Sequence, residues 1–211
     1  MLTALFLALT FQASPSTDAR FDAWVAACTP HRHDLEATAA LIAETGWERV
    51  EADDHPELAG SLRALTDPQT DERITMSYSL WARAVEGRRV HIVLNSASTV
   101  IGRDEDADGD GKLAEWERAS TFDIIGCGLW DFDADKPIDP AAVTAWVGAA
   151  PIQTHDDPRI VGGTWSLAGR LEQPGELHVG FVPKGSPFAT PVPGRGGFSG
   201  VSISLSSAPR E

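Results

Sequence analysis

The segment from residue 74 to residue 94 constrains the fold more than any other part of the chain. Apolar and polar residues alternate over much of Ile74–Val85, and this period of two is typical of a β-strand with one buried face. Residues 86–88 form a turn, after which residues 89–94 return with similar character. The pattern predicts a β-hairpin, and with it an antiparallel sheet.

Helical composition marks several other segments, each with local start or stop signals. Gly46 ends one of them, and Asp139 followed by Pro140 is a capped start for another. The predicted helices are 18–27, 34–44, 56–65 and 139–147. Further strand candidates are 47–50, 121–132, 164–171, 176–182 and 198–205. Together these segments predict an α+β fold in which helices pack on an antiparallel sheet.

The acidic segment 106–117 has the spacing of a calcium loop. It reads Asp-Ala-Asp-Gly-Asp-Gly-Lys-Leu-Ala-Glu-Trp-Glu and resembles the loop of an EF-hand. Calcium takes about six to eight oxygen ligands, and alternate residues of a tight loop direct side chains to one centre. Gly111 stands where the backbone must turn sharply. The resemblance implies a Ca²⁺ site whose ligands are Asp106, Asp108, Asp110, the backbone carbonyl of Lys112, and Glu117.

Two other interpretations of this segment stay open. A second register from Asp104 to Glu115 keeps the acids but places Gly111 where an apolar residue belongs. The Asp and Gly residues of the segment also favour an acidic turn that binds no ion. Only one such loop is present, and the preceding residues 96–102 are poor helix formers. We therefore expect a low-affinity structural clasp at 104–118, inserted between two strands, rather than a sensor.

The N-terminus and the cysteines favour export. Residues 1–11 are almost entirely apolar and small residues follow, which predicts a signal peptide at 1–13. A buried N-terminal helix and a misassigned start codon are the alternatives. Cys28 and Cys127 form an even pair, which in an exported protein predicts a disulfide, with two separate thiols as the alternative. The expected location is periplasmic or secreted, with an α+β domain at 18–150 and a β-rich C-terminal extension of that domain at 151–211.

Net charge and motifs exclude several function classes. The net charge of −14 argues against nucleic-acid binding and against an anionic membrane surface. No stretch of the mature chain is long and apolar enough for a membrane span. No catalytic motif is found, so no catalytic residue is predicted. Residues 31–34 favour a polar loop with Asp34 as helix cap over a metal site, and residues 155–158 favour a turn.

The arrangement before residue 151 also resembles small secreted bacterial proteins of unknown function. The shared features are the early Cys28, a helix ending in Gly46 and Trp47, the hairpin, and Cys127 in a later strand. This resemblance implies no activity. We expect an exported, non-enzymatic calcium-binding protein of unknown partner. The alternatives are a secreted or periplasmic hydrolase, and a cell-envelope binding module presenting the loop at 184–197.

Overall fold

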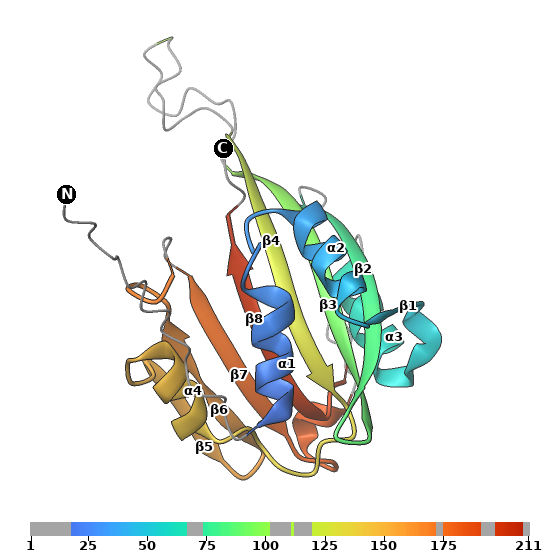
Figure 1. Cartoon of the computed structure of the whole chain (residues 1–211), viewed down its shortest axis with the longest axis vertical. Coiled ribbons are helices and arrows are strands. Elements are labelled where there is room, and N and C mark those ends of the chain that lie inside the picture. Colours follow the sequence, from blue (N-terminus) through green and yellow to red (C-terminus); the bar gives the residue numbers. More distant parts are fainter. Residues whose placement is uncertain are drawn as a thin grey trace, which may run out of the picture.

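The fold is built on one antiparallel sheet. The computed structural model describes residues 18–66, 74–101, 111, 120–171, 175–190 and 197–208 (Figure 1). Within this part, eight strands lie in the order β1-β2-β3-β4-β8-β7-β6-β5, with every neighbouring pair antiparallel. The strands are β1 (Glu48–Val50), β2 (Ile74–Val85), β3 (Arg88–Ile101), β4 (Ser120–Asp131), β5 (Gln153–Asp157), β6 (Ile160–Ser166), β7 (Glu176–Val182) and β8 (Gly200–Ser207). The sheet thus consists of two four-stranded meanders joined by their last strands, β4 and β8.

The predicted hairpin is confirmed as β2 and β3. The two strands pair from Val85 with Arg88 to Ile74 with Thr99. Glu86 and Gly87 connect them, with φ angles of 49° and 78°. Positive φ at both central residues is the requirement of a tight two-residue hairpin turn, whose twist matches that of the strands. Glycine adopts this geometry at no steric cost, which explains Gly87.

Four α-helices occur in the described segments. They are α1 (Ala19–Cys28), α2 (Leu35–Glu44), α3 (Pro56–Thr66) and α4 (Pro140–Val147). Aspartate side chains cap three of them: Asp18 accepts from the Arg20 amide at 3.0 Å, Asp34 from the Ala37 amide at 2.9 Å, and Asp139 from the Ala141 amide at 2.8 Å. Each cap satisfies a backbone donor that has no partner inside the helix, so the local sequence determines where these helices begin.

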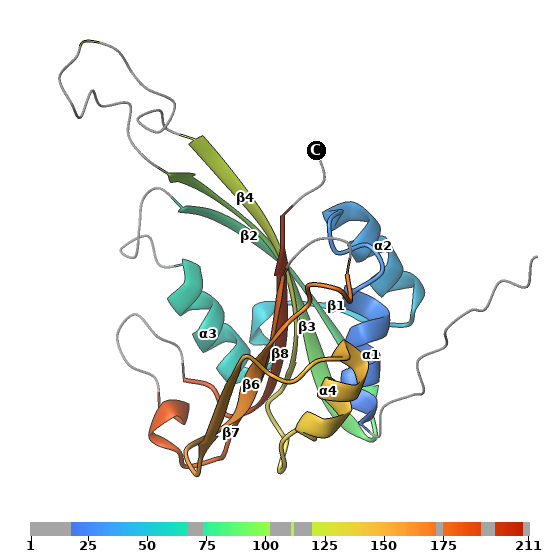
Figure 2. The same cartoon turned by 90° about the vertical axis from the view of Figure 1, so that its left-hand side faces the viewer.

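The predicted α+β fold of helices packed on a sheet is wrong. The molecule is mostly antiparallel sheet, and its few helices are only 8 to 11 residues long. They are also divided: α1, α2 and α4 lie on one side of the sheet, and α3 lies on the other (Figure 2). The prediction underweighted the sheet because β5 carries no apolar alternation and because β3 continues to Ile101, well beyond the predicted range 89–94.

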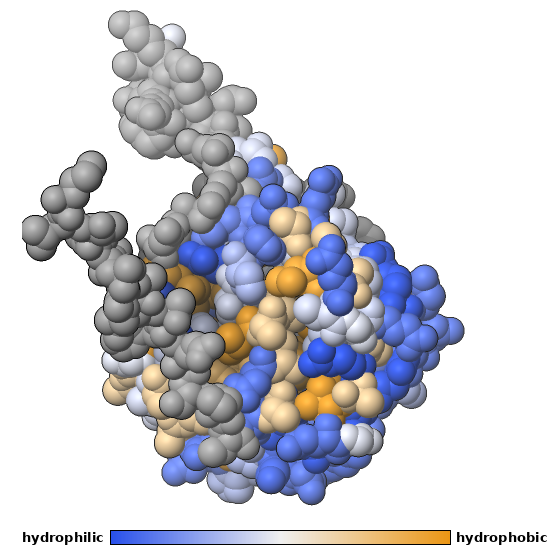
Figure 3. All heavy atoms as spheres, in the orientation of Figure 1, coloured by the Kyte–Doolittle hydropathy of each residue, from blue (hydrophilic) through white to orange (hydrophobic). Residues whose placement is uncertain are grey.

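The main core lies on the sheet face that α1 meets. Residues paired across neighbouring strands form a row there, and all are buried: Leu94, Cys127, Leu205, Leu177 and Trp165. Trp24 of α1 is fully buried in the same cluster and donates its indole N–H to the Cys127 carbonyl at 3.3 Å. Viewed from this side, the surface is largely hydrophilic with smaller apolar areas between (Figure 3).

A disulfide joins Cys28 to Cys127, as the cysteine count predicts. It connects the last residue of α1 to the middle of β4, across 99 residues of sequence. Cross-linking distant residues restricts the unfolded chain, which in the chain-entropy account stabilises a loop of this length by about 4–5 kcal/mol. The bond therefore fixes α1 on the sheet face and adds to the burial of Trp24.

The prediction of a turn at residues 155–158 is wrong for residues 155–157. They belong to β5, the edge strand that pairs with β6 from Gln153–Thr164 to Asp157–Ile160. Most side chains of β5 are exposed, so the apolar alternation that reveals a half-buried strand is absent. Across the described ranges, no helix has the length and apolar character needed to cross a membrane.

Candidate functional site

The acidic segment connects β3 to β4. β3 ends at Ile101, β4 begins at Ser120, and these two residues are partners in the ladder. Antiparallel partners lie only about 4.5–5.5 Å apart between Cα atoms, so both ends of the connection are held together by the sheet. The predicted ligands Asp106, Asp108, Asp110, Lys112 and Glu117 lie outside the described residues, as do the signal peptide at 1–13 and the second register's Asp104 and Glu115.

Gly111 is the one residue of the predicted loop that the structure describes. It is exposed, and its φ angle is +79°, in the left-handed region that glycine reaches without strain. A side-chain carbon added at Gly111 would meet nothing within 4 Å, so packing does not explain the glycine. Backbone conformation does explain it, because a residue with a Cβ reaches this positive φ only with strain.

The histidines considered from the sequence do not come together. His33 is buried and its Nδ1 lies 2.6 Å from the Ala208 carbonyl, so it anchors the C-terminal strand to the helix connection. His31 is exposed nearby, and His155 is exposed on the edge strand β5. Over the described ranges, no group of three or more His, Cys, Asp or Glu side chains is arranged to hold a metal ion.

A polar cluster that the sequence did not reveal lies beside α3. Arg89 donates two hydrogen bonds of 2.8 Å to Asp54, and His91 Nε2 lies 2.7 Å from the same carboxylate. The bonds from Arg89 lower the pKa of Asp54 to about 2, with a further contribution from His91 and opposition from burial. A carboxylate that accepts charged donors in this way stays ionised throughout the neutral range.

Burial governs His91. Its side chain is 1% exposed, and desolvation lowers the pKa of its imidazole even though the Asp54 carboxylate favours the charged form. The neutral ring then donates from Nε2 to Asp54, while the buried Nδ1 has no hydrogen-bond partner among the described residues. His55 and Phe132 lie close by, with ring centroids 6.1 Å and 5.5 Å from that of His91. This enclosed arrangement is a structural polar contact within an aromatic cluster.

A second contact ties the start of α3 to the C-terminal meander. The Glu57 carboxylate accepts the backbone N–H of Ser199 at 2.6 Å and its hydroxyl at 2.9 Å. The Glu57 amide in turn donates to His55 Nδ1 at 3.2 Å. Ser199 is a donor to a carboxylate here, so its hydroxyl is not set up as a nucleophile with a histidine base.

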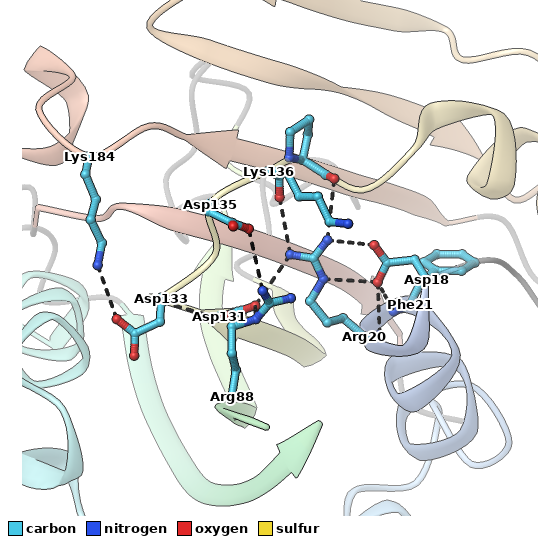
Figure 4. Close-up of polar contacts among 10 residues, drawn as sticks. Asp18, Arg20, Phe21, Arg88, Asp131, Asp133, Asp135, Lys136 and Lys184 are labelled. Carbon is cyan, nitrogen blue, oxygen red and sulfur yellow. Dashed lines mark hydrogen bonds and ion pairs between the residues drawn. The ribbon is translucent and has the colours of Figure 1, made fainter. Parts of the chain in front are cut away.

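An ionic cluster larger than the one at Asp54 surrounds Arg20 at the start of α1 (Figure 4). Arg20 is 1% exposed and pairs with Asp18 at 2.6 Å and with the fully buried Asp131 at 3.4 Å. It also donates to the carbonyls of Lys136 and Pro137, at 3.3 and 3.4 Å. Nearly every guanidinium donor therefore has an acceptor, which is the condition for burying a charge.

Arg88 adds a second positive charge to Asp131. Its Nε lies 3.1 Å from Asp131 Oδ2, but no hydrogen bond of proper geometry forms there. The contact is an attraction between charges, and it orients the end of the β2–β3 hairpin toward β4. Further out, Lys184 pairs with Asp133 at 3.2 Å with both side chains more than half exposed. This cluster joins α1, the hairpin and β4, and its role is structural.

Comparison with known protein families, with curated proteins and with solved structures found no match.

Proposed function

We propose that this is an exported calcium-binding protein in which the ion acts as a structural clasp on the β3–β4 connection. The observation that carries the proposal is the spacing of Asp106, Asp108, Asp110 and Glu117 around Gly111. Close acidic side chains repel one another unless a cation neutralises them, and calcium prefers the oxygen ligands they supply. The proposed ligand set is that of the 106–117 register.

Two features of the described residues support the proposal, and the second favours this register. The pairing of Ile101 with Ser120 holds the ends of the connection together, so an ion has only to order the residues between them. Gly111 has φ +79° at the loop's sixth position, where the EF-hand turn needs a glycine. In the register from 104 to 115 the same glycine falls at the eighth position, where the loop does not require a positive φ.

Export is part of the proposal. The Cys28–Cys127 disulfide fits an oxidising compartment, and residues 1–13 have the pattern of a signal peptide. A lone loop without a partner hand fits a weak site, with a dissociation constant of about 10⁻⁴–10⁻³ M. Calcium outside cells reaches that range, so a weak site of this kind is filled there and empty in cytosol.

The two alternative functions receive no specific support. A hydrolase of the Ser-His-Asp type would need a histidine beside a nucleophile. Among the described residues, Ser199 is bound to Glu57, and Thr164 lies 3.0 Å from a His178 ring that is more than half exposed. A binding module would need exposed tryptophan beside the loop at 184–197. Trp130 lies near Phe198, with ring centroids 5.9 Å apart, but it is half-buried within an aromatic cluster.

The test is thermal unfolding of the full mature protein with and without calcium. At a calcium concentration about 10- to 100-fold above the dissociation constant, binding to the folded state adds about 1.4–2.7 kcal/mol. For a domain of this size that raises Tm by about 3–10 °C. Glu117→Gln removes the bidentate ligand and should abolish the rise.

Glu115→Gln is the matched control, because it makes the same change two residues earlier, at a loop position that supplies no ligand in the 106–117 register. It should retain the calcium-dependent rise in Tm. An unchanged Tm in the natural protein, or an equal rise in Glu117→Gln, contradicts the proposal. Loss of the rise in Glu115→Gln but not in Glu117→Gln would move the site to the 104–115 register and contradict the proposed ligand set.

A further inference from the structure

The two faces of the sheet differ sharply where β3, β4 and β8 meet. On the α1 face, the paired row contains large buried side chains. The neighbouring row, shifted by one residue along each strand, faces α3 instead. It consists of Val93, Gly128, Ser204, His178 and Thr164. The next row brings Asn95 beside Gly126 and Ser206. Glycine and serine thus replace bulky residues over the centre of this face, and a hollow results.

The hollow lies under α3 and has a volume of about 170 Å³. Gly126 and Gly128 of β4 form its floor, and Ser204 and Ser206 of β8 lie along one side. Its walls are Leu62 of α3, Met76 and Tyr78 of β2, Val93 and Asn95 of β3, and Trp130 of β4. Tyr78 is 39% exposed, so the hollow opens to solvent beside this side chain.

Close approach of neighbouring groups favours glycine at both positions of the floor. A Cβ at Gly126 would collide with the side-chain amide of Asn95, whose Cγ would lie only 3.0 Å away. A Cβ at Gly128 would lie 3.1 Å from the Ile203 carbonyl oxygen and 3.5 Å from the Trp130 indole nitrogen. Any larger residue would therefore displace the amide or the indole, and the hollow would be filled.

Asn95 is the amide group inside this mostly apolar hollow. Its side chain lies against Gly126, and no residue in the described part of the chain makes a hydrogen bond to it. An amide side chain offers both donors and an acceptor, and the half-buried Asn95 amide can exchange solvent contacts for hydrogen bonds to a ligand in the hollow. A ligand that presents an amide or a comparable donor–acceptor edge would satisfy it.

Size and charge narrow the ligand class further. None of the described residues that line the hollow is charged, so these walls would not replace the hydration that an ionised ligand loses on entering. An apolar cavity of about 150 Å³ accommodates a benzene ring in another protein. Trp130 and Tyr78 provide aromatic walls, against which a flat ring packs edge to face or offset. We propose that this hollow binds a neutral, single-ring aromatic molecule that carries one amide-like polar group.

Benzamide is a suitable probe, and benzoate is its charged counterpart of the same shape. Titration into the full, disulfide-bonded protein with calcium present, followed by ligand-observed NMR, should give a dissociation constant for benzamide of about 1 mM or below. Benzoate should bind at least about tenfold more weakly, because its charge must be desolvated. Absence of benzamide binding, or equal binding of the two probes, overturns the proposal.

Two variants locate the site. Ser204→Leu places an isobutyl group in the hollow and should abolish benzamide binding. Ser202→Leu is the matched control, since Ser202 lies on the same strand and the same sheet face but does not line the hollow. It should bind benzamide like the natural protein. Binding that persists in a folded Ser204→Leu variant, checked by its circular dichroism, contradicts the assignment.

Asn95→Leu provides a second, independent measurement. It removes the amide and keeps the side chain's size. Benzamide should then bind this variant no more tightly than toluene does. A retained preference for benzamide contradicts the role of Asn95 even where Ser204→Leu does not fold. Because all titrations are made with calcium present, and repeated without it, failure here is separate from failure of the calcium clasp.

Discussion

At the scale of single residues, buried polar groups determine how this protein responds to pH and to mutation. Asp131 is fully buried, and the charges of Arg20 and Arg88 accompany it. His91 is buried beside Asp54 in its neutral form. Each of these groups depends on a partner that is far away in sequence, so each position is sensitive to substitution.

Acid should destabilise the protein through His91. Burial holds its folded pKa below the ordinary value of 6.5, so the unfolded chain takes up the proton first as pH falls below that value. Stability from this group is therefore complete above pH 6.5 and declines below it, by at most about 1.4 kcal/mol per pH unit for one proton. His91→Gln keeps a donor for Asp54 and does not titrate. Urea unfolding at several pH values should give a flatter profile for this variant, and parallel profiles would contradict the assignment.

Removing the Arg20 charge should be much more damaging than removing that of Lys184. Arg20→Met leaves Asp18 and the buried Asp131 short of a partner, at a cost of about 3–5 kcal/mol in unfolding free energy. Lys184→Met breaks an exposed pair with Asp133 and should change it by less than about 1 kcal/mol. Chemical denaturation compares the two variants directly. Equal effects would mean that the cluster does not depend on Arg20.

At the scale of elements, the disulfide secures α1 on a sheet face that depends on large apolar side chains. Cys28→Ser combined with Cys127→Ser should lower the unfolding free energy by about 4–5 kcal/mol in the chain-entropy account. Reduction of the natural protein should have an effect of the same size. A loss below about 1 kcal/mol, measured by urea denaturation, would show that burial of Trp24 alone holds the helix.

Elements that neighbouring residues specify could be predicted from the sequence. Elements and contacts that depend on long-range pairing could not. The β2–β3 hairpin and the capped start of α4 depend on neighbours in sequence, so alternation, Asp139 and Pro140 were enough. β5 carries exposed polar residues and lacks that signal. The contact between Asp54 and His91 spans 37 residues and corresponds to no motif, and the placement of β8 beside β4 is equally non-local. The calcium ligands were predicted from spacing alone and stay a prediction.

At the scale of the whole molecule, two meanders share one sheet, and a disulfide joins α1 to its centre. The acidic connection extends from the paired ends of β3 and β4, on a chain with a net charge of −14. A cation bound there would relieve local repulsion and order the connection. A calcium clasp would therefore act on the intact chain, since the strands that hold the two ends of the connection belong to the whole sheet.

The most direct test is a calcium titration of the full, disulfide-bonded protein followed by tryptophan emission, with Trp116→Phe to assign the signal. Trp116 stands next to the last proposed ligand, Glu117, and should report its coordination. A calcium clasp predicts a saturable change with a dissociation constant of about 10⁻⁴–10⁻³ M, absent in both Trp116→Phe and Glu117→Gln. No change at calcium about tenfold above that range, or a change that survives in Glu117→Gln, would contradict it.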